Sequence, residues 1–438
     1  MWRMLFASEL GYLLLIALDI SLVRVFSQDV GVVTTIAGGG KIHEGSKTDC
    51  VEDSPPSMDG IGTEARFNYP WGIVFDPTYN VLYVADCGCP ETVHRNDRIR
   101  KIDVNSRRVT TLAGGAQGYK DGMGDKAKFH QTAGLAIDTK GRILYVADSA
   151  NDRIRKIDLT TAEVTSFVGS GESGFLDDVG TKALLANPQQ LELDSMKMRL
   201  YVSDTDNHAV RIISLPNGDV RTLVGGSRGF ADGVGKEAKF FHPTGISLDT
   251  DSGILYLADH YNHALRTVDT TNGQVRTLAG NGREGFKDGI GSEARFNYPE
   301  GIAFDSDNKV LYVVEFDSNA VRIVTPQGKV STLAGGTEGY LDGVGRQAMF
   351  YHPTGLTFDH RKKIIYLTDQ YNHRIRSVSG IGSSVVDPNK SVFARSLQRT
   401  QSFPHLFAYL ILSCLFSFVA FMWCVRRRQR LVFRSSLL

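Results

Sequence analysis

The chain of 438 residues repeats one sequence pattern six times. Each copy reads approximately Asp-Gly-x-Gly, Phe, Pro-x-Gly-Ile-x-Phe-Asp, Leu-Tyr-Val-Ala-Asp, Asn-x-x-Ile-Arg and Val-x-Thr-Leu-Ala-Gly-Gly. The tyrosine of the second apolar run marks the copies, at Tyr83, Tyr145, Tyr201, Tyr256, Tyr312 and Tyr366. A regular period indicates that one small structural unit is stacked repeatedly, because such a unit buries its apolar face only against its neighbours.

Each copy contains four short runs with β-branched or aromatic residues at alternate positions, separated by Gly, Pro, Asn or Asp. In the fourth copy these runs are 245–248, 254–257, 265–268 and 275–278. Four antiparallel strands form a sheet that cannot bury both of its faces alone, and radial stacking around a channel solves this problem. We therefore predict an all-β, six-bladed β-propeller of four-stranded antiparallel blades over residues 32–379.

The two ends of the repeat array predict how the ring closes. Residues 33–38 form a fourth-strand motif with no copy before them, and the last copy ends after residues 375–378 without its own fourth strand. We expect the N-terminal segment to be the outer strand of the last blade, which removes an unpaired sheet edge.

An Asn-His pair follows the second apolar run in three copies, as Asn207-His208, Asn262-His263 and Asn372-His373. With the neighbouring Tyr-Val-Ala-Asp and Ile-Arg elements, the repeats resemble the NHL-repeat family over residues 32–379. The resemblance implies a six-bladed propeller. It does not specify a function, because propellers of this type include enzymes, RNA-binding modules and protein-binding modules.

Recurring polar residues are interpreted first as parts of the architecture. An acidic residue ends the second run of every copy, and an Asn or Ser and then an Arg follow in most copies. Side chains needed once for chemistry would not occur six times, so we expect turn hydrogen bonds and Arg–acid pairs. The Asp-Gly-x-Gly segments lack the additional ligands of a calcium loop and are interpreted as turns.

The termini predict membrane attachment. Residues 403–425 are an almost uninterrupted apolar stretch of 23 residues without a charge, which is long enough for a transmembrane helix. Residues 426–438 form a short basic tail that is expected in the cytoplasm. Residues 1–27 resemble a signal peptide, with an uncleaved anchor as the alternative. Residues 380–402 have the composition of a stalk and contain a glycosylation sequon at Asn389. These features predict a single-pass protein whose propeller is extracellular or luminal.

Three cysteines lie outside the predicted helix. In an oxidising compartment, Cys50 is expected to form a disulfide with Cys87 or Cys89. The alternatives are free thiols, or a metal site that combines Cys87, Cys89 and His94.

Binding residues are expected where the copies differ, beside the proline that starts the first run. These positions should surround one mouth of the central channel, where aromatic rings and a few polar groups suit a ligand. The predicted ligand-binding residues are Tyr69, Trp71, His242, Tyr298, Glu300 and His352.

The predicted function is recognition: a membrane-tethered scaffold that binds a protein, peptide or glycan. No cofactor is predicted, and the sequence does not determine the oligomeric state. One alternative is a metal-dependent enzyme that resembles peptidyl-α-hydroxyglycine α-amidating lyase, with His242, His352 and Glu300 as candidate ligands of zinc or calcium. An RNA-binding NHL module is a second alternative, but 49 basic and 48 acidic residues do not indicate a nucleic-acid partner.

Overall fold

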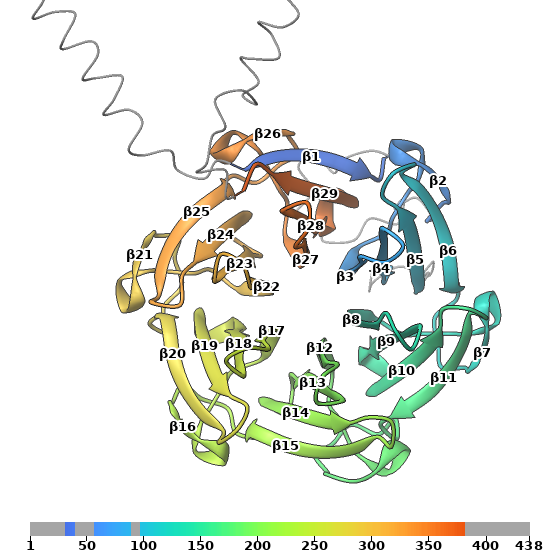
Figure 1. Ribbon diagram of the computed structural model, residues 1–438, viewed down its shortest axis with the longest axis horizontal. Coiled ribbons are helices and arrows are strands. Elements are labelled where there is room, and N and C mark those ends of the chain that lie inside the picture. The colour runs from blue at the N-terminus through green and yellow to red at the C-terminus, as the bar shows by residue number, and fades with distance from the viewer. Residues whose placement is uncertain (1–30, 40–56, 89–96, 382–438) are drawn as a thin grey trace, which may run out of the picture. The chain divides into compact units, whose positions relative to one another are not determined.

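A computed structural model describes residues 31–39, 57–88 and 97–381. In this part of the chain, six antiparallel sheets follow one another around a central channel (Figure 1). The predicted six-bladed propeller is therefore confirmed.

The strands (β) and short 3-10 turns (η) recur in the same order in each blade. The first blade contains β2 (Gly60–Ile61), η2 (Gly62–Glu64), β3 (Pro70–Asp76), β4 (Val81–Asp86), β5 (Arg98–Asp103) and β6 (Arg108–Gly114). The second contains β7 (Gly122–Met123), η3 (Gly124–Lys126), β8 (Thr132–Asp138), β9 (Ile143–Asp148), η4 (Ser149–Asn151), β10 (Arg153–Asp158) and β11 (Glu163–Val168). The third contains η5 (Gly180–Lys182), β12 (Pro188–Asp194), β13 (Arg199–Asp204), β14 (Ala209–Ser214) and β15 (Asp219–Gly225).

The remaining blades follow the same plan. The fourth contains β16 (Gly233–Val234), η6 (Gly235–Glu237), β17 (Pro243–Asp249), β18 (Ile254–Asp259), η7 (His260–Asn262), β19 (Ala264–Asp269) and β20 (Gln274–Gly280). The fifth contains β21 (Gly289–Ile290), η8 (Gly291–Glu293), β22 (Pro299–Asp305), β23 (Val310–Glu315), β24 (Ala320–Val324) and β25 (Lys329–Gly335). The sixth contains β26 (Gly343–Val344), η9 (Gly345–Gln347), β27 (Pro353–Asp359), β28 (Ile364–Asp369), η10 (Gln370–Asn372), β29 (Arg374–Ser379) and the N-terminal β1 (Val32–Ala37).

The number of strands per blade differs from the predicted four in five of the six blades. Five of the six sheets have five strands, because the middle of each Asp-Gly-x-Gly segment pairs with the outer strand of its own blade. The third sheet keeps four strands, and there Asp178 replaces the glycine and Val179 alone bridges Asp219.

Ring closure occurs as predicted. β1 is antiparallel to β29, with Val33 opposite Val378 and Val32 opposite Ser379. Figure 1 shows the two strands side by side, although they lie at opposite ends of the repeat array. The Oγ1 atom of Thr34 and the Oγ atom of Ser377 are hydrogen-bonded at 2.8 Å. The apolar core lies between neighbouring blades, and at the closure it joins Tyr366 and Ile375 to Phe67.

A buried arginine holds each blade together. In the first blade Arg100 donates to Asp86 at 2.7 Å and to Asp59 at 2.9 Å. The equivalent arginines are equally buried and make the same two types of ion pair, at Arg155, Arg211, Arg266, Arg322 and Arg376. Asp59 also accepts from the Thr111 backbone N–H. The expected Arg–acid pairs are therefore confirmed, and the aspartate of Asp-Gly-x-Gly does more than form a turn.

In the part of the chain that the structure describes, no helix is long and apolar enough to cross a bilayer. The predicted signal peptide (1–27), most of the stalk (382–402 with Asn389), the transmembrane segment (403–425) and the tail (426–438) lie outside the described residues. Those predictions stay predictions.

Candidate ligand-binding site

All six inner strands begin at one mouth of the channel, and the residue before each has the same unusual backbone. Its φ lies between 48° and 55° in every copy, at Tyr69, Gln131, Asn187, His242, Tyr298 and His352. Non-glycine residues seldom adopt this left-handed conformation. Because it recurs in all six copies, it belongs to the propeller architecture and does not mark a single strained site.

The backbone N–H of each of these residues is bonded by the preceding blade. The histidine of the Asn-His pair is the acceptor in three cases: His208 Nδ1 for His242, His263 Nδ1 for Tyr298 and His373 Nδ1 for Tyr69. An Nδ1 atom that accepts an N–H must be deprotonated. Burial correspondingly lowers the pKa of His208 and of His263. The Asn-His histidine thus connects neighbouring blades as a neutral imidazole.

A cavity of about 470 Å³ opens at this mouth. Three of the predicted binding residues line it: Trp71, His242 and Glu300. His260, Tyr261 and Phe316 also line it and were not predicted. They follow the acidic residue that ends the second strand of a copy, so variation at that position was the sequence signal that could have identified them.

The other three predicted residues lie beside the cavity and pack against its aromatic surroundings. Tyr69 is buried, with its ring 5.1 Å from Tyr371. The Tyr298 ring lies 5.0 Å from His260, and the His352 ring lies 4.1 Å from Phe316. These three residues therefore pack beside the cavity and do not line it.

The main electrostatic feature of the cavity is an ion pair between two blades. His260 Nδ1 lies 2.7 Å from Glu300 Oε2, and both side chains are largely buried. Burial alone would lower the pKa of His260, but the Glu300 carboxylate reverses the effect and raises it above its ordinary value. The pair therefore places an imidazole ring and a carboxylate side by side at the mouth, joined across two blades.

The remaining histidines of the mouth have separate acidic neighbours. His242 Nδ1 lies 3.6 Å from Asp206, and His352 Nδ1 lies 3.3 Å from Asp317. The donor atoms of His242, His352 and Glu300 do not all lie within 4.8 Å of one another, so the structure does not gather the predicted metal ligands into one cluster.

A different group of three donor atoms lies within 4.8 Å among the described residues: Asp305, Asp307 and His360. Lys363 Nζ contacts both carboxylates of this group, at 3.1 Å and 2.6 Å. The ammonium group already occupies the position of a cation between them.

Of the predicted disulfide, only Cys87 lies among the described residues. Its side chain is buried beside the mouth, and its thiol donates a hydrogen bond to the Tyr69 carbonyl at 2.9 Å. Cys50 and Cys89 lie outside the described residues, as does His94. The pairing stays a prediction.

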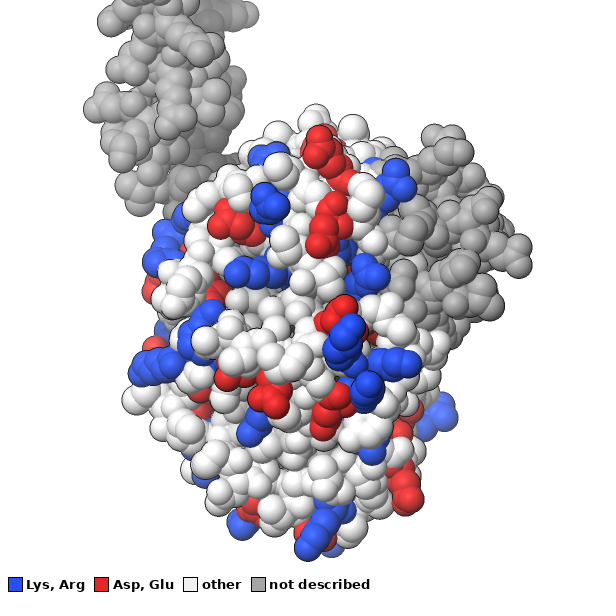
Figure 2. All heavy atoms as spheres, turned by 90° about the vertical axis from the view of Figure 1, so that its right-hand side faces the viewer, with Lys and Arg blue, Asp and Glu red and all other residues white. Residues whose placement is uncertain are grey.

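Charge is mixed on the side of the propeller seen in Figure 2. Lysine and arginine side chains are interspersed there with aspartate and glutamate, and no continuous basic surface forms on that side. This face does not have the character of a nucleic-acid interface.

Comparison with known proteins supports the repeat assignment. No family model matches the chain. It is 32% identical over 311 residues to NHL repeat-containing protein 2 of Homo sapiens, covering 63% of this chain and 42% of that protein. It is 30% identical over 281 residues to the chloroplastic Protein SUPPRESSOR OF QUENCHING 1 of Arabidopsis thaliana, covering 61% of this chain and 26% of that protein. The chain thus spans well under half the length of these relatives.

Among solved structures, an auxiliary nutrient binding protein from Bacteroides thetaiotaomicron matches with a TM-score of 0.60 and 19% identity, over 80% of this chain and 76% of that one. A protein of the same description from Bacteroides ovatus matches with a TM-score of 0.58 and 21% identity, with the same coverage. At this level of identity the likeness supports the fold alone.

Proposed function

Because the chain is a six-bladed propeller homologous to NHL repeat-containing proteins, we propose that it is a recognition scaffold that binds its ligand at the ring-lined mouth of the channel. The ligand is a protein segment, a peptide or a glycan. The observation that carries the proposal is the cavity of about 470 Å³ where Trp71, Tyr261 and Phe316 surround the His260–Glu300 pair.

The chemistry of the cavity suits recognition. Aromatic rings contribute large contact areas at low entropic cost, and a few fixed polar groups orient a ligand. The cavity residues come from different blades, so the rigid ring keeps them in place without a bound partner. Asp206 and Glu300 also line the cavity and favour a ligand with hydrogen-bond donors or positive charge.

The proposed setting is a membrane surface. Its support is the sequence alone: the apolar segment 403–425, the basic residues after it and the sequon at Asn389. On this proposal the propeller is extracellular or luminal. Glycosidase treatment of the full-length chain should increase its gel mobility, and Asn389→Gln should abolish that change. An unmodified chain whose Asn389 is accessible only from the cytoplasm would refute this orientation.

The binding proposal can be tested without knowing the natural ligand. The full-length chain, reconstituted in lipid nanodiscs, is used to select binders from a displayed peptide library and from a glycan array. Trp71→Ala and Tyr261→Ala should each weaken the selected binders by about tenfold or more, since aromatic contacts of this type dominate binding energy.

Tyr79→Ala is the matched control, because Tyr79 is an exposed aromatic residue that is not part of the mouth cavity. It should leave affinity unchanged. Binders whose affinity is insensitive to both mouth variants would contradict the proposal, and the class of the surviving binder distinguishes peptide from glycan.

A further inference from the structure

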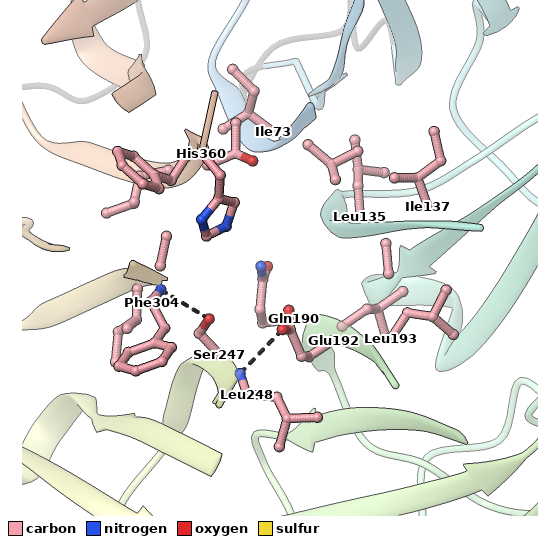
Figure 3. Close-up of a pocket in the computed structure, with 18 of the residues that line it drawn as sticks. Ile73, Leu135, Ile137, Gln190, Glu192, Leu193, Ser247, Leu248, Phe304 and His360 are labelled. Carbon is pink, nitrogen blue, oxygen red and sulfur yellow. Dashed lines mark hydrogen bonds between the residues drawn. The ribbon is translucent and has the colours of Figure 1, made fainter. Parts of the chain in front are cut away.

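A second cavity lies at the opposite end of the channel. It has a volume of about 310 Å³ and is formed by the later residues of all six inner strands. Its wall combines aliphatic side chains with polar ones, and Ile73, Leu135 and Leu193 are among the aliphatic residues that Figure 3 shows around it. Between the two cavities the channel narrows to a space of about 10 Å³, which is about the volume needed for one water molecule. The second cavity is therefore separate from the mouth.

Three glycines, Gly245, Gly301 and Gly355, are among the residues that line the narrowing, and one blade lacks the glycine at this position. A Cβ atom at Gly72, Gly245, Gly301 or Gly355 would lie 2.0 to 2.4 Å from a carbonyl oxygen of the next blade. The third blade has Gln190 at this position. Figure 3 shows the Gln190 amide in the middle of the channel.

The same blade departs again two residues later. Glu192 takes the position that is Val74, Ala136, Ser247, Ala303 and Thr357 in the other blades. Gln190 and Glu192 both line the second cavity. The third inner strand thus adds an amide and a carboxylate to a lining that elsewhere consists of apolar side chains, hydroxyl groups and His360.

An architectural role explains only part of Glu192. Its Oε1 atom accepts the Leu248 backbone N–H of the next blade at 3.1 Å. Ser247 and Thr357 do the same with a hydroxyl group, for Phe304 at 3.1 Å and for Phe75 at 3.3 Å. A neutral side chain therefore suffices for this bond, and a half-buried carboxylate is the costlier solution.

No cation accompanies the carboxylate. Among the described residues that line this cavity, the ionisable side chains are Glu192 and His360. No ion pair of Glu192 occurs within the described part of the chain. Burial lowers the pKa of His360, which favours a neutral imidazole. Burial raises the pKa of Glu192 to about 7, as expected for a carboxyl group that lacks a counter-ion.

We propose that this second cavity binds a small organic ammonium ion, with Glu192 as its counter-ion, Gln190 as a hydrogen-bond partner and the aliphatic wall around its apolar body. The ligand is a primary amine on a compact hydrocarbon frame, because the cavity is at the small end of ligand pockets. In its ionised form Glu192 repels a carboxylate or phosphate ligand. The site is independent of the mouth, so it does not rest on the proposed function.

Cyclohexylammonium is the probe, with cyclohexanol and cyclohexanecarboxylate as matched neutral and anionic frames. Binding to the full-length chain in nanodiscs is measured by ligand-observed NMR, with empty nanodiscs as the reference. We expect saturable binding of cyclohexylammonium, weaker binding of cyclohexanol and none of the carboxylate. Glu192→Gln should weaken the ammonium probe by about tenfold or more, since hydrogen bonds to charged groups are the stronger ones.

Glu192→Gln is a matched variant because its amide oxygen can still accept the Leu248 N–H. Trp71→Ala, at the mouth, should leave the probe unaffected. No saturable binding, equal binding of cyclohexanol, or equal affinity in the Glu192→Gln chain would each overturn the proposal. The comparison of the three probes on the unchanged chain decides the question even if the variant does not fold.

Discussion

The two ends of the central channel are built from the same six inner strands, yet they differ in whether their charged side chains form ion pairs. At the mouth, Glu300 pairs with His260 at 2.7 Å, and His242 and His352 each lie beside an aspartate. At the other end Glu192 lines the second cavity and makes no ion pair within the described residues. The comparison teaches that departures of single blades from the repeat, Glu300 at one end and Glu192 at the other, set the chemistry of each end.

The largest effect is expected when a buried acid that forms an ion pair loses its partner and so becomes unpaired like Glu192. Arg266→Met leaves Asp259 buried without its partner, which lies at 2.5 Å. The unfolding free energy should fall by about 3–5 kcal/mol, measured by chemical denaturation of the full-length chain. Arg276→Met, at an exposed position on the next strand, is the control and should change little. Equal effects of the two variants would refute the role of the buried pair.

The second prediction removes the lone carboxylate. The pKa of Glu192 is raised from 4.5 to about 7 in the folded chain, so between these values the folded state holds more protons than the unfolded state. Stability should therefore fall as pH rises from about 4.5 to about 7. Glu192→Gln should flatten that slope and be more stable than the unchanged chain by about 2–3 kcal/mol above this interval. An unchanged slope in the denaturation midpoints would contradict the account.

The third prediction concerns the mouth, where the pH dependence comes from a histidine and not from a carboxyl group. The folded-state pKa of His260 is raised by Glu300, so its contribution is fully present below the unfolded pKa of 6.5 and is lost as pH rises through the folded value. Glu300→Gln should remove this dependence and reduce stability at pH 6. An NMR titration of His260 should also show its pKa fall in the variant. If it does not fall, the pairing is wrong.

The smallest effect isolates the hydrogen bond that Glu192 shares with its counterparts. Ser247→Ala leaves the Phe304 N–H without its acceptor and should cost about 1 kcal/mol. Ala303→Ser, at the equivalent position in the fifth blade, is the reciprocal variant and should not destabilise the chain. Thermal unfolding of both variants measures the difference, and no loss for Ser247→Ala would show that this bond contributes nothing.

The repeat made much of the fold predictable. Ring closure by β1 was predictable because the repeat array has an extra fourth-strand motif at its N-terminal end and lacks one at its C-terminal end. The strand positions were predictable from the alternation of apolar and polar residues. The fifth strand, present in five of the six blades, was not predictable, because two residues are too few to show an alternating pattern. The bond of Asp59 to Arg100 joins residues far apart in sequence and leaves no local pattern. The sequence therefore predicts only a turn at Asp59.

The candidate site was predictable only in part for the same reason. Variation beside the proline identified Trp71, His242 and Glu300, which line the cavity. The partner of Glu300 is His260, which comes from the preceding blade and follows a different strand, so a comparison at one repeat position could not pair them. Glu192 lies where most copies have an apolar or small residue, and only the structure places it at a second cavity.

The most direct test of two separate sites crosses two variants with two ligands on the full-length chain. One ligand is a binder selected at the mouth, and the other is cyclohexylammonium. We predict that Trp71→Ala weakens only the selected binder and that Glu192→Gln weakens only cyclohexylammonium, each by about tenfold or more. If either variant weakens both ligands equally, the two ends of the channel are not independent sites and the account fails.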